Sequence, residues 1–590
     1  MSVTSQIRSA VTGALQELYQ QSFSEKDFQV NETKPEFEGD YTVVLFSLVK
    51  QLKRSPDAIG NELGQKLVAD NPGLFTAFNL IKGFLNLSIS NAFWTSFLSG
   101  NYNNDQYGFQ AANGRKVMIE YSSPNTNKPL HLGHLRNNFL GWSVAEIFKA
   151  NGADVVKTCI VNDRGIHICK SMIAWQLFAN GATPQSTGTK GDHFVGDYYV
   201  KFNDELKKQV SELVQQGMKE EDAEKQAPIM KQAQQMLIDW EAGNPEIMDL
   251  WKRMNNWVYG GFDETYRRIG SDFQKIYYES ETYLLGKKYV EQGLSKGIFY
   301  KKEDGSVWID LTSDGLDQKL LQRKDGTSVY ITQDLGLADM KQTEFHAHQS
   351  VYVIGDEQNY HMQVLKLICQ KLGIPNADGI HHLSYGMVEL PSGKMKSREG
   401  TVVDADELLD EMYAIAAHHT QELGKVKDFA EDELKELYNT ISLGALKFFL
   451  LRVDPKKRMI FNPQESIDFH GFTGPFVQYT HARIKSVLRK DHPRGAETGN
   501  GLLPLEKELL ISLERFPSVV EQAGIEMNPS VIALYAFNLA KTFNSFYTEH
   551  SIMNAESPEK KELRLRTAQL TAHVIRSAMK LLGINVPERM

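Results

Sequence analysis

Two histidines separated by a leucine and a glycine are the residues whose types and spacing point most clearly to chemistry. They form the segment His131-Leu132-Gly133-His134, which opens a predicted helix after a predicted strand. Ligands of open parallel sheets bind at the carboxyl ends of strands, where helix N-termini present unpaired N–H groups and partial positive charge. Two imidazoles there add donors for phosphate oxygens, and the glycine leaves room for a planar base. The motif alone also fits ordinary surface or capping histidines.

A second polar group, Gly-Lys-Met-Lys-Ser-Arg at 393–398, lies between a predicted strand and a predicted helix. Three cations and a hydroxyl on a glycine-flanked loop suit a clamp on a triphosphate, whose negative charge spreads in the transition state. By itself this loop also fits a basic surface segment. The order of the two motifs, one early and one late in the same α/β region, argues against coincidence.

The elements that must position these motifs form a βαβ unit. A short apolar run at 117–122 predicts a strand, the residues from 131 to 150 predict a helix with one broad apolar stripe, and 155–161 predicts the next strand. Such a unit requires parallel pairing and a right-handed crossover. Further strands are predicted at 328–332, 350–355 and 381–390, with helices between them. Together they predict a doubly wound α/β core.

The rest of the chain predicts separate parts around this core. We expect an α+β domain at 1–112, the α/β domain at 113–403, a helical connector at 404–460 and an all-α helix bundle at 461–590. The boundary near 112 follows a stretch rich in Asn, Gly and Gln, which are turn and linker residues. Residues 204–258 are dense in Lys, Glu and Gln without a strand pattern, and they predict a solvated helical insertion.

Composition excludes several classes of protein. The chain has 590 residues, a formal charge of −9 and 10% aromatic residues, which is typical of a globular protein and not of a disordered one. We expect no membrane span, because no apolar stretch approaches about 18 residues. The N-terminus lacks the apolar core of a signal peptide. Three scattered cysteines are too few for a disulfide framework or a zinc site, so we expect no protein-bound metal and a reducing, cytoplasmic location.

The two motifs and their surroundings resemble the class I aminoacyl-tRNA synthetases, with their HIGH and KMSKS motifs, and in particular the arginyl-tRNA synthetases. The similar segments cover nearly the whole chain: 119–125 with 128–130, 162–165, 330–336, 358–361, 474–490 and 581–590. This resemblance implies a Rossmann-type catalytic domain and a ligase that joins L-arginine to tRNA(Arg). It also implies an arginyl-adenylate formed from ATP with Mg²⁺ as substrate, arginine activation only with tRNA bound, and a monomer.

For ATP, the resemblance implies catalytic roles for His131, His134, Lys394 and Lys128. The implied ATP-binding residues are His131, Gly133, His134, Lys394, Met395, Lys396 and Ser397. In Lys-Met-Lys-Ser-Arg the position of the family's second lysine holds Ser397. A lysine just before the first motif, Lys128 here, is thought to compensate in such enzymes. We expect Lys394 and Lys128 to be the main cations on the leaving pyrophosphate.

For arginine, a site must offer carboxylates, because a guanidinium presents a fork of N–H donors that match them. Glu120 and Asp334 are predicted to lie at the carboxyl ends of two core strands. The resemblance implies that they receive the guanidinium together with Tyr330, while Asn125 and Gln358 hold the amino-acid backbone. Without the resemblance, each carboxylate fits an ion pair with a neighbouring Lys or Arg equally well.

For tRNA, a local basic stretch matters more than the net charge of the chain. Residues 441–490 hold nine Lys and Arg against three acids, and Tyr479 and His481 lie among them as possible stacking partners for bases. The resemblance implies an anticodon-binding role for 461–590 and a contact with the tRNA elbow for 1–112. The predicted tRNA-binding residues are Tyr479, Arg483, Lys485 and Arg489.

Two other readings remain open at this point. The first is a different nucleotidyltransferase with the same first motif. A small-molecule adenylyltransferase of this kind would not need the long helical C-terminus. A cysteinyl-type ligase would need thiolate metal ligands that three dispersed cysteines do not supply. A synthetase-like RNA-binding protein without catalysis is the other reading, against which the intact motif residues argue.

Overall fold

A parallel five-stranded sheet forms the centre of the molecule, as the sequence predicts. The computed structural model describes every residue except 1, 35, 390, 392–402, 423–427 and 500. The strand order is β12-β11-β5-β6-β7. From β5 the chain adds β6 and β7 toward one edge of the sheet and later adds β11 and β12 toward the other edge, so the strand order switches between β5 and β11. Ligands of such sheets bind at this switch point, outside the carboxyl ends of the strands. The strands are β5 (Lys116–Glu120), β6 (Asp154–Val161), β7 (Lys275–Tyr278), β11 (Gln349–Gly355) and β12 (Ile380–Tyr385).

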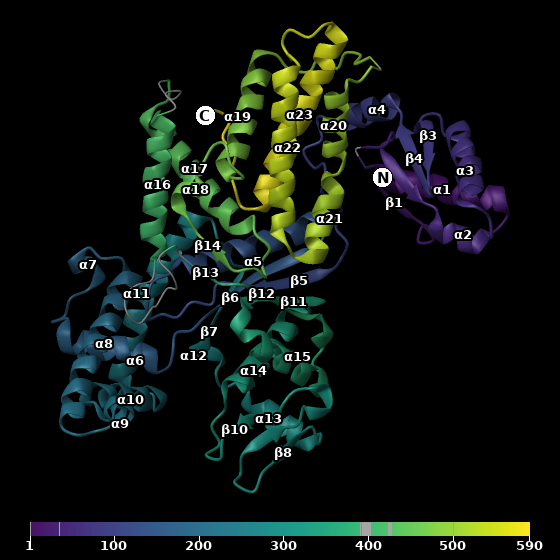
Figure 1. Cartoon of the computed structure of the whole chain (residues 1–590). Helices are drawn as coiled ribbons and strands as arrows, with labels where there is room; N and C mark the ends of the chain where they lie inside the picture. Colours follow the sequence, from purple (N-terminus) through teal and green to yellow (C-terminus); the bar gives the residue numbers. More distant parts are fainter. Residues whose placement is uncertain (1, 35, 390, 392–402, 423–427, 500) are drawn as a thin grey trace.

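Helices cover both faces of this sheet. Figure 1 shows α5 above the sheet, beside the C-terminal helices, and α14 and α15 below it. In α5 the buried residues extend around much of the helix, because it packs between the sheet and the C-terminal helices. The prediction of a doubly wound α/β core is confirmed. The helices are α5 (Leu132–Ala150), α6 (Ile166–Phe178), α14 (Tyr330–Phe345) and α15 (Asn359–Leu372).

One predicted strand, 328–332, is wrong. Tyr330 begins α14, and before it only Ser328 makes an isolated bridge, to Gln322. The β-branched and aromatic residues here favour a strand locally. Over a longer window, however, the buried residues Ile331, Leu335 and Ala338 recur at helical spacing, and this pattern prevails.

The predicted strand at 381–390 is divided in two. β12 ends at Tyr385, and β13 (Val388–Glu389) pairs instead with β14 (Met459–Ile460). Gly386 breaks the first ladder because its N–H donates to Pro455 O at 2.9 Å and its carbonyl accepts from Arg136 Nη1 at 2.5 Å.

The insertion is helical, as predicted, but it extends beyond 204–258 at both ends. It also has a core of its own, in which Phe202 and Phe262 are fully or almost fully buried. The description of this unit as simply solvated is therefore wrong. Its helices are α7 (Pro184–Thr187), α8 (Gly191–Gln215), α9 (Glu220–Gln226), α10 (Pro228–Glu241) and α11 (Pro245–Ile269).

A smaller antiparallel sheet, which the sequence analysis did not predict, precedes α14. Its strand order is β10-β9-β8, and it packs at the end of the molecule farthest from the C-terminal helices (Figure 1). Its strands are β8 (Phe299–Lys301), β9 (Val307–Ile309) and β10 (Lys319–Gln322). Two helices, α12 (Glu279–Thr282) and α13 (Lys287–Ser295), precede them.

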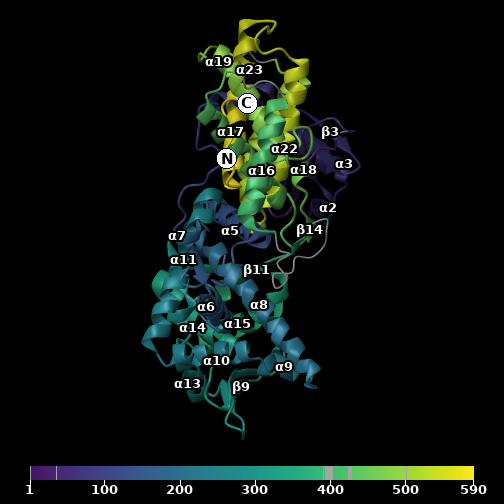
Figure 2. The ribbon, with the colours of Figure 1, turned by 90° about the vertical axis from the view of Figure 1, so that its left-hand side faces the viewer.

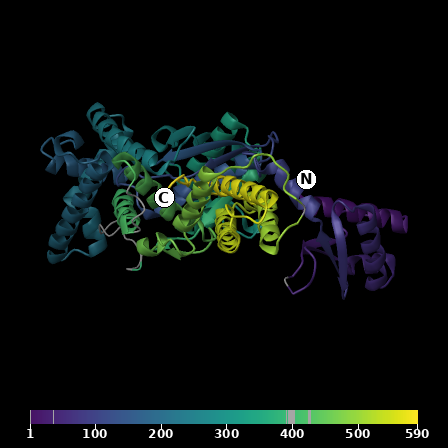
Figure 3. The same cartoon turned by 90° about the horizontal axis from the view of Figure 1, so that it is seen from above.

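The N-terminal part is an α+β unit, as predicted. Its antiparallel sheet has the order β1-β2-β4-β3, and Figure 3 shows it at the end of the molecule opposite the insertion. Lys507 Nζ, 2.7 Å from Asp40 Oδ2, ties it to the C-terminal helices. Its elements are α1 (Val3–Tyr19), β1 (Gln29–Glu32), β2 (Tyr41–Val44), α2 (Phe46–Leu52), α3 (Pro56–Asp70), β3 (Phe75–Ile81), β4 (Phe84–Ile89) and α4 (Asn91–Asn101).

The C-terminal part is a helix bundle, as predicted, apart from the short strand β14. Figure 2 shows these helices stacked above the central α/β region. Within the described residues, no helix is both long enough and apolar enough to cross a membrane. The helices are α16 (Ala405–Glu422), α17 (Glu431–Leu451), α18 (Pro463–Ser466), α19 (Gly474–Lys490), α20 (Pro504–Glu514), α21 (Phe516–Glu526), α22 (Pro529–Glu549) and α23 (Pro558–Leu581).

Candidate active site

One cavity of about 420 Å³ lies at the carboxyl ends of β5 and β11, where such sheets bind ligands. It gathers side chains from segments far apart in the sequence. All the predicted arginine-site residues line it, together with the predicted ATP-site residues that the structure describes apart from Lys128. These lining residues are Glu120, Asn125, His131, Gly133, His134, Tyr330, Asp334 and Gln358. The predicted residues Lys394, Met395, Lys396 and Ser397 fall outside the described residues.

The two histidines of the first motif cap α5 with one ring nitrogen each. His131 is the N-cap residue, and its Nδ1 accepts the Gly133 N–H at 3.1 Å. His134 Nδ1 accepts the His131 N–H at 3.2 Å. Because both Nδ1 atoms act as acceptors, each neutral ring carries its proton on Nε2. The rings lie 3.9 Å apart between centroids, so the two Nε2–H donors form one compact group.

Burial keeps both rings neutral. It lowers the pKa of His131 to about 3, with a smaller contribution from Lys128, and it lowers the pKa of His134 well below its usual value. Burial also lowers the pKa of Lys128. Among the residues that the structure describes, Lys128 has no ion-pair partner, so this ammonium group is available to an anion.

The floor of the cavity contains a buried ion pair. Glu120, at the end of β5 and 6% exposed, receives Lys341 Nζ on Oε2. The Lys341 ammonium lies 5.4 Å from the Tyr277 ring centroid and 5.1 Å from that of Tyr352. The alternative that the sequence left open for Glu120, a pair with a neighbouring cation, is therefore present in the structure.

Asp334 lies in the second turn of α14, so its predicted place at the end of a strand is wrong. The helix nevertheless brings it to the cavity, because Tyr330, Asp334 and Lys341 recur at helical spacing on one face. Asp334 Oδ2 lies 2.6 Å from His361 Nε2. The Tyr330 ring, itself 61% exposed, lies 5.0 Å from the His361 ring between centroids.

Sequence reasoning missed several charged or titratable residues of this cavity, among them Glu279, Lys341, Glu357 and His361. His361 closes the motif at 358–361, so its position gave a signal that was not used. Glu279 and Lys341 follow no motif, and only the fold brings them to the site. Burial raises the pKa of Glu279; the charges of Asp163 and Asp334 add to this shift, and that of Arg164 opposes it.

Comparison with known proteins decides the family. The family profile described as "tRNA synthetases class I (R), catalytic domain" matches residues 98–462. Those described as "Arginyl tRNA synthetase N terminal domain" and "DALR anticodon binding domain" match 5–89 and 477–590. The arginine–tRNA ligase of Bacteroides thetaiotaomicron is 52% identical over the full length of both chains, and that of Amoebophilus asiaticus is 51% identical, also over both full lengths. The chain belongs to the arginyl-tRNA synthetase family.

Solved structures agree with this assignment at the level of the fold. The arginyl-tRNA synthetase of Thermus thermophilus superposes with a TM-score of 0.79 at 24% identity over 99% of each chain. That of Plasmodium falciparum gives 0.78 at 17% identity, over 100% of this chain and 99% of its own. The resemblance drawn from the motifs is confirmed. The catalytic-domain profile extends to residue 462 and thus includes α16 and α17.

In this synthetase the predicted tRNA-binding residues all lie on α19. Tyr479, Arg483 and Arg489 line a second cavity, of about 310 Å³, together with Arg589 near the C-terminus. Lys485 lies outside that cavity and pairs with Glu588 at 3.0 Å.

His481, in contrast, is fully buried. Its Nδ1 lies 3.0 Å from Pro587 O. The suggestion that this ring stacks on a base is therefore wrong, because it faces the interior of the helix bundle.

The depressed pKa of His131 makes part of the stability of the protein depend on pH. The unfolded ring titrates near pH 6.5 and the folded ring near 3, so between these values the unfolded state binds more protons and stability falls as the pH decreases. Asn keeps a capping oxygen but does not titrate. We expect the thermal midpoint of the wild type to fall, relative to that of His131→Asn, as the pH drops from about 6.5 to about 4.

Calorimetry of the two proteins across this range measures the effect. The other buried histidines, such as His481, are present in both proteins and therefore cancel in the difference. A difference in midpoint that stays constant with pH would show that His131 does not titrate as the structure indicates.

Proposed function

We propose that the chain joins L-arginine to tRNA(Arg) in the cavity between β5 and β11. The arginine carboxylate attacks the α-phosphorus of ATP, the bond to the bridging oxygen of the β-phosphate breaks, and pyrophosphate leaves. The 2′-hydroxyl of the terminal tRNA ribose then attacks the activated carbonyl and releases AMP. No protein nucleophile is needed, so catalysis consists of positioning and charge stabilisation. The observation that carries the proposal is that one cavity is lined by both the imidazole donors and the carboxylates.

For ATP, His131 and His134 donate their Nε2–H groups to phosphate oxygens as neutral rings. Gly133 gives space to the adenine in this proposal, and it also leaves room for the His131 ring, which a Cβ there would meet at 3.0 Å. Lys128 supplies a cation beside them, and the lack of a described partner supports this role. Lys394, with Met395, Lys396 and Ser397, remains a prediction from the family motif. Mg²⁺ enters with ATP as part of the substrate.

For arginine, Asp334 and Glu120 receive the guanidinium beside Tyr330. Asp334 is the principal acceptor in this proposal, because the carboxylate of Glu120 is already paired with the buried ammonium group of Lys341, whereas Asp334 contacts the ring of His361. Asn125 and Gln358, which line the same cavity, hold the amino-acid backbone. A lysine substrate would leave unpaired the side-chain oxygens that accept from the guanidinium. Such unpaired groups allow the site to select arginine over lysine by a factor of up to about 10⁴.

For tRNA, we propose that Tyr479, Arg483 and Arg489 form a basic surface at the second cavity and that Lys485 lies at its edge. In this proposal the tRNA elbow is contacted by residues 1–112, the acceptor stem by 404–460 and the anticodon by 461–590. Catalysis takes place in residues 113–403. A cytoplasmic monomer is the proposed state of the enzyme, and the three buried free thiols suit a reducing compartment.

Exchange of radiolabelled pyrophosphate into ATP tests the proposed reaction directly. We expect exchange with arginine alone among the twenty amino acids, and only when tRNA is added. Exchange driven by another amino acid would contradict the assignment of the pocket, whereas exchange without tRNA would contradict only the coupling to tRNA.

The role of Asp334 predicts a selective loss in Asp334→Asn. The variant keeps the size of the side chain but loses the charge that faces the guanidinium. We expect KM for arginine to rise about 10- to 100-fold, as for one lost charged hydrogen bond, while KM for ATP stays within about twofold. Asp339→Asn is the matched control, because this carboxyl on the same helix contacts Tyr289 and Lys288 outside the cavity. An equal loss for both substrates would mean that the pocket is misplaced.

The basic surface predicts a salt effect in Arg489→Ala. Arg489 is exposed and its Nη1 donates to Glu588 O at 2.8 Å. Loss of one phosphate contact should weaken tRNA binding and reduce the slope of log affinity against log salt by about one. Filter binding at a series of salt concentrations measures this slope. Lys435→Ala, on the exposed face of α17, should leave it unchanged. An unchanged slope in Arg489→Ala would remove this residue from the interface.

A further inference from the structure

The start of α8, a helix of the insertion, lies directly against the segment that leads into His131. The inserted helix α8 begins at Gly191, and a Cβ on Gly196 would come within 2.8 Å of Pro129 Cδ and 3.6 Å of Lys128 Cα. On its other side this turn packs on α11, where a Cβ on Gly261 would overlap Asp192. The start of α8 is thus wedged between α11 and the segment that leads into His131.

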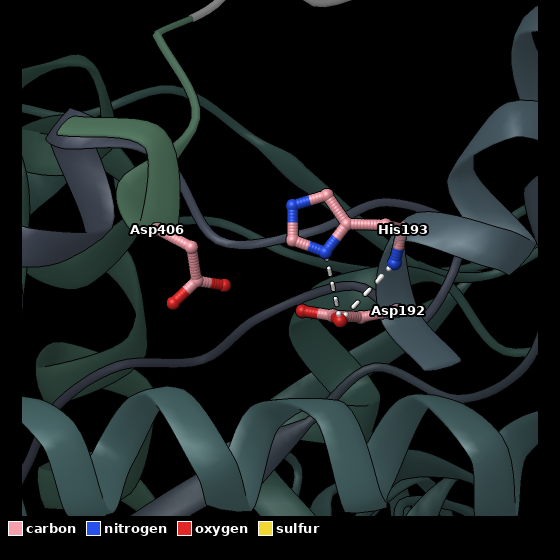
Figure 4. A group of neighbouring side chains, drawn as sticks. All are labelled: Asp192, His193 and Asp406. Atoms are coloured by element: carbon pink, nitrogen blue, oxygen red, sulfur yellow. Dashed lines mark hydrogen bonds and ion pairs between the residues drawn. The ribbon is translucent and has the colours of Figure 1, made fainter. Parts of the chain in front are cut away.

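Charged side chains of this turn hold the start of α16. His193 Nε2 lies 2.9 Å from Asp404 Oδ2, and His193 Nδ1 lies 3.3 Å from Asp192 Oδ1. Lys190 Nζ lies 2.7 Å from Asp406 Oδ2. Figure 4 shows the carboxyl groups of Asp192 and Asp406 beside the His193 ring. Contacts with Asp192 and then Asp404 raise the pKa of His193 to about 10, so the ring is a cation in this network.

The start of α16 in turn supports the backbone around His131. Leu132 N–H donates to Val403 O at 3.1 Å, and Ala405 N–H donates to Leu130 O at 3.0 Å. His131 and Asp404 form the bridge between these two bonds. Asp404 Oδ1 also accepts the N–H groups of Asp406 and Glu407, at 2.8 and 3.0 Å, which fixes its carboxylate at the first turn of α16.

We infer that the start of α8, with Lys190 and His193, is a positioning element of the ATP site. His193, through Asp404, and Lys190, through Asp406, fix the segment 403–406, and this segment fixes the backbone on which the His131 and His134 donors depend. These side chains touch no substrate, so they are positioning residues. The inference rests on the proposed function, since it concerns how the two imidazoles meet ATP.

The same cluster has the spacing of a cation site, but it is already neutralised. One ligand atom each from Asp192, His193 and Asp406 lies within 4.8 Å of the others. Lys190 Nζ lies 3.1 Å from Asp192 Oδ2 and also contacts Thr265 Oγ1 at 2.6 Å, so the ammonium group bridges the two carboxylates. We therefore assign these residues to an ion-pair network and not to a metal site.

His193→Gln and Asp404→Asn test the inference, because each keeps the size of the side chain and removes its charge. Displacement of catalytic groups by a distant change costs up to about 100-fold in rate. We expect kcat for arginine-dependent pyrophosphate exchange to fall about 10- to 100-fold, while KM for arginine stays within about twofold. The double variant should lose no more than the worse single variant, because both act through one contact. His193→Lys, which retains a cation, should recover part of the rate.

Hydrogen exchange of the ligand-free protein gives a second readout that needs no turnover. Amides of 130–134 should exchange about 10-fold faster in Asp404→Asn, since local opening becomes easier, while the thermal midpoint changes little. Asp249→Asn is the control, because this carboxylate pairs with Arg253 on the outer face of α11 and is 77% exposed. It should match the wild type in both measurements.

Two results would overturn the inference: unchanged exchange of amides 130–134 in both charge-neutral variants, or losses of kcat that add in the double variant. Failure of the wild type to exchange pyrophosphate with arginine would instead contradict the proposed function. In that case the hydrogen-exchange comparison still decides whether the insertion positions the His131 segment.

Discussion

The capping of α5 by two histidines is the interaction on which the active site depends. His131 and His134 each use Nδ1 for a backbone N–H, and this use leaves Nε2–H as the only donor of each neutral ring. The cap therefore sets both the direction of the two imidazoles that we propose for the nucleotide and the nitrogen on which each carries its proton. The cap keeps this geometry only while the backbone that leads into α5 is fixed in place. Segments far away in the sequence fix that backbone.

The second constraint is that the cavity gathers acidic side chains that need partners. Each of the two central acids has one: Glu120 pairs with the buried Lys341, and Asp334 contacts His361. Removing the cation would leave a buried carboxylate uncompensated, which is strongly unfavourable. The fixed ammonium group of Lys341 thus compensates Glu120 in the floor of the pocket, whereas Asp334 meets a histidine ring.

Much of this organisation is predictable from sequence, and the failures have physical causes. The strand, helix and strand around His131 follow from local periodicity, because each element buries residues at its own spacing. Tyr330 was assigned to a strand because five β-prone residues were weighed without the longer helical stripe of α14. The burial of His481 and the pairing of Glu120 could not be predicted in the same way. No local sequence pattern shows that the histidine at 481 faces the core, or that the lysine two turns beyond Asp334 reaches Glu120.

The insertion shows why charged helical segments are hard to interpret from sequence. A solvated face and a buried ion-pair network use the same residue types, and only tertiary contacts distinguish them. Here Asp192 is fully buried and Lys190 is largely so. Apolar packing is not directional, whereas each cation here meets carboxylates at specific positions: Lys190 meets those of Asp192 and Asp406, and His193 meets those of Asp192 and Asp404. Such a network fixes the register of one segment against another, which is what a helix cap supporting catalysis requires.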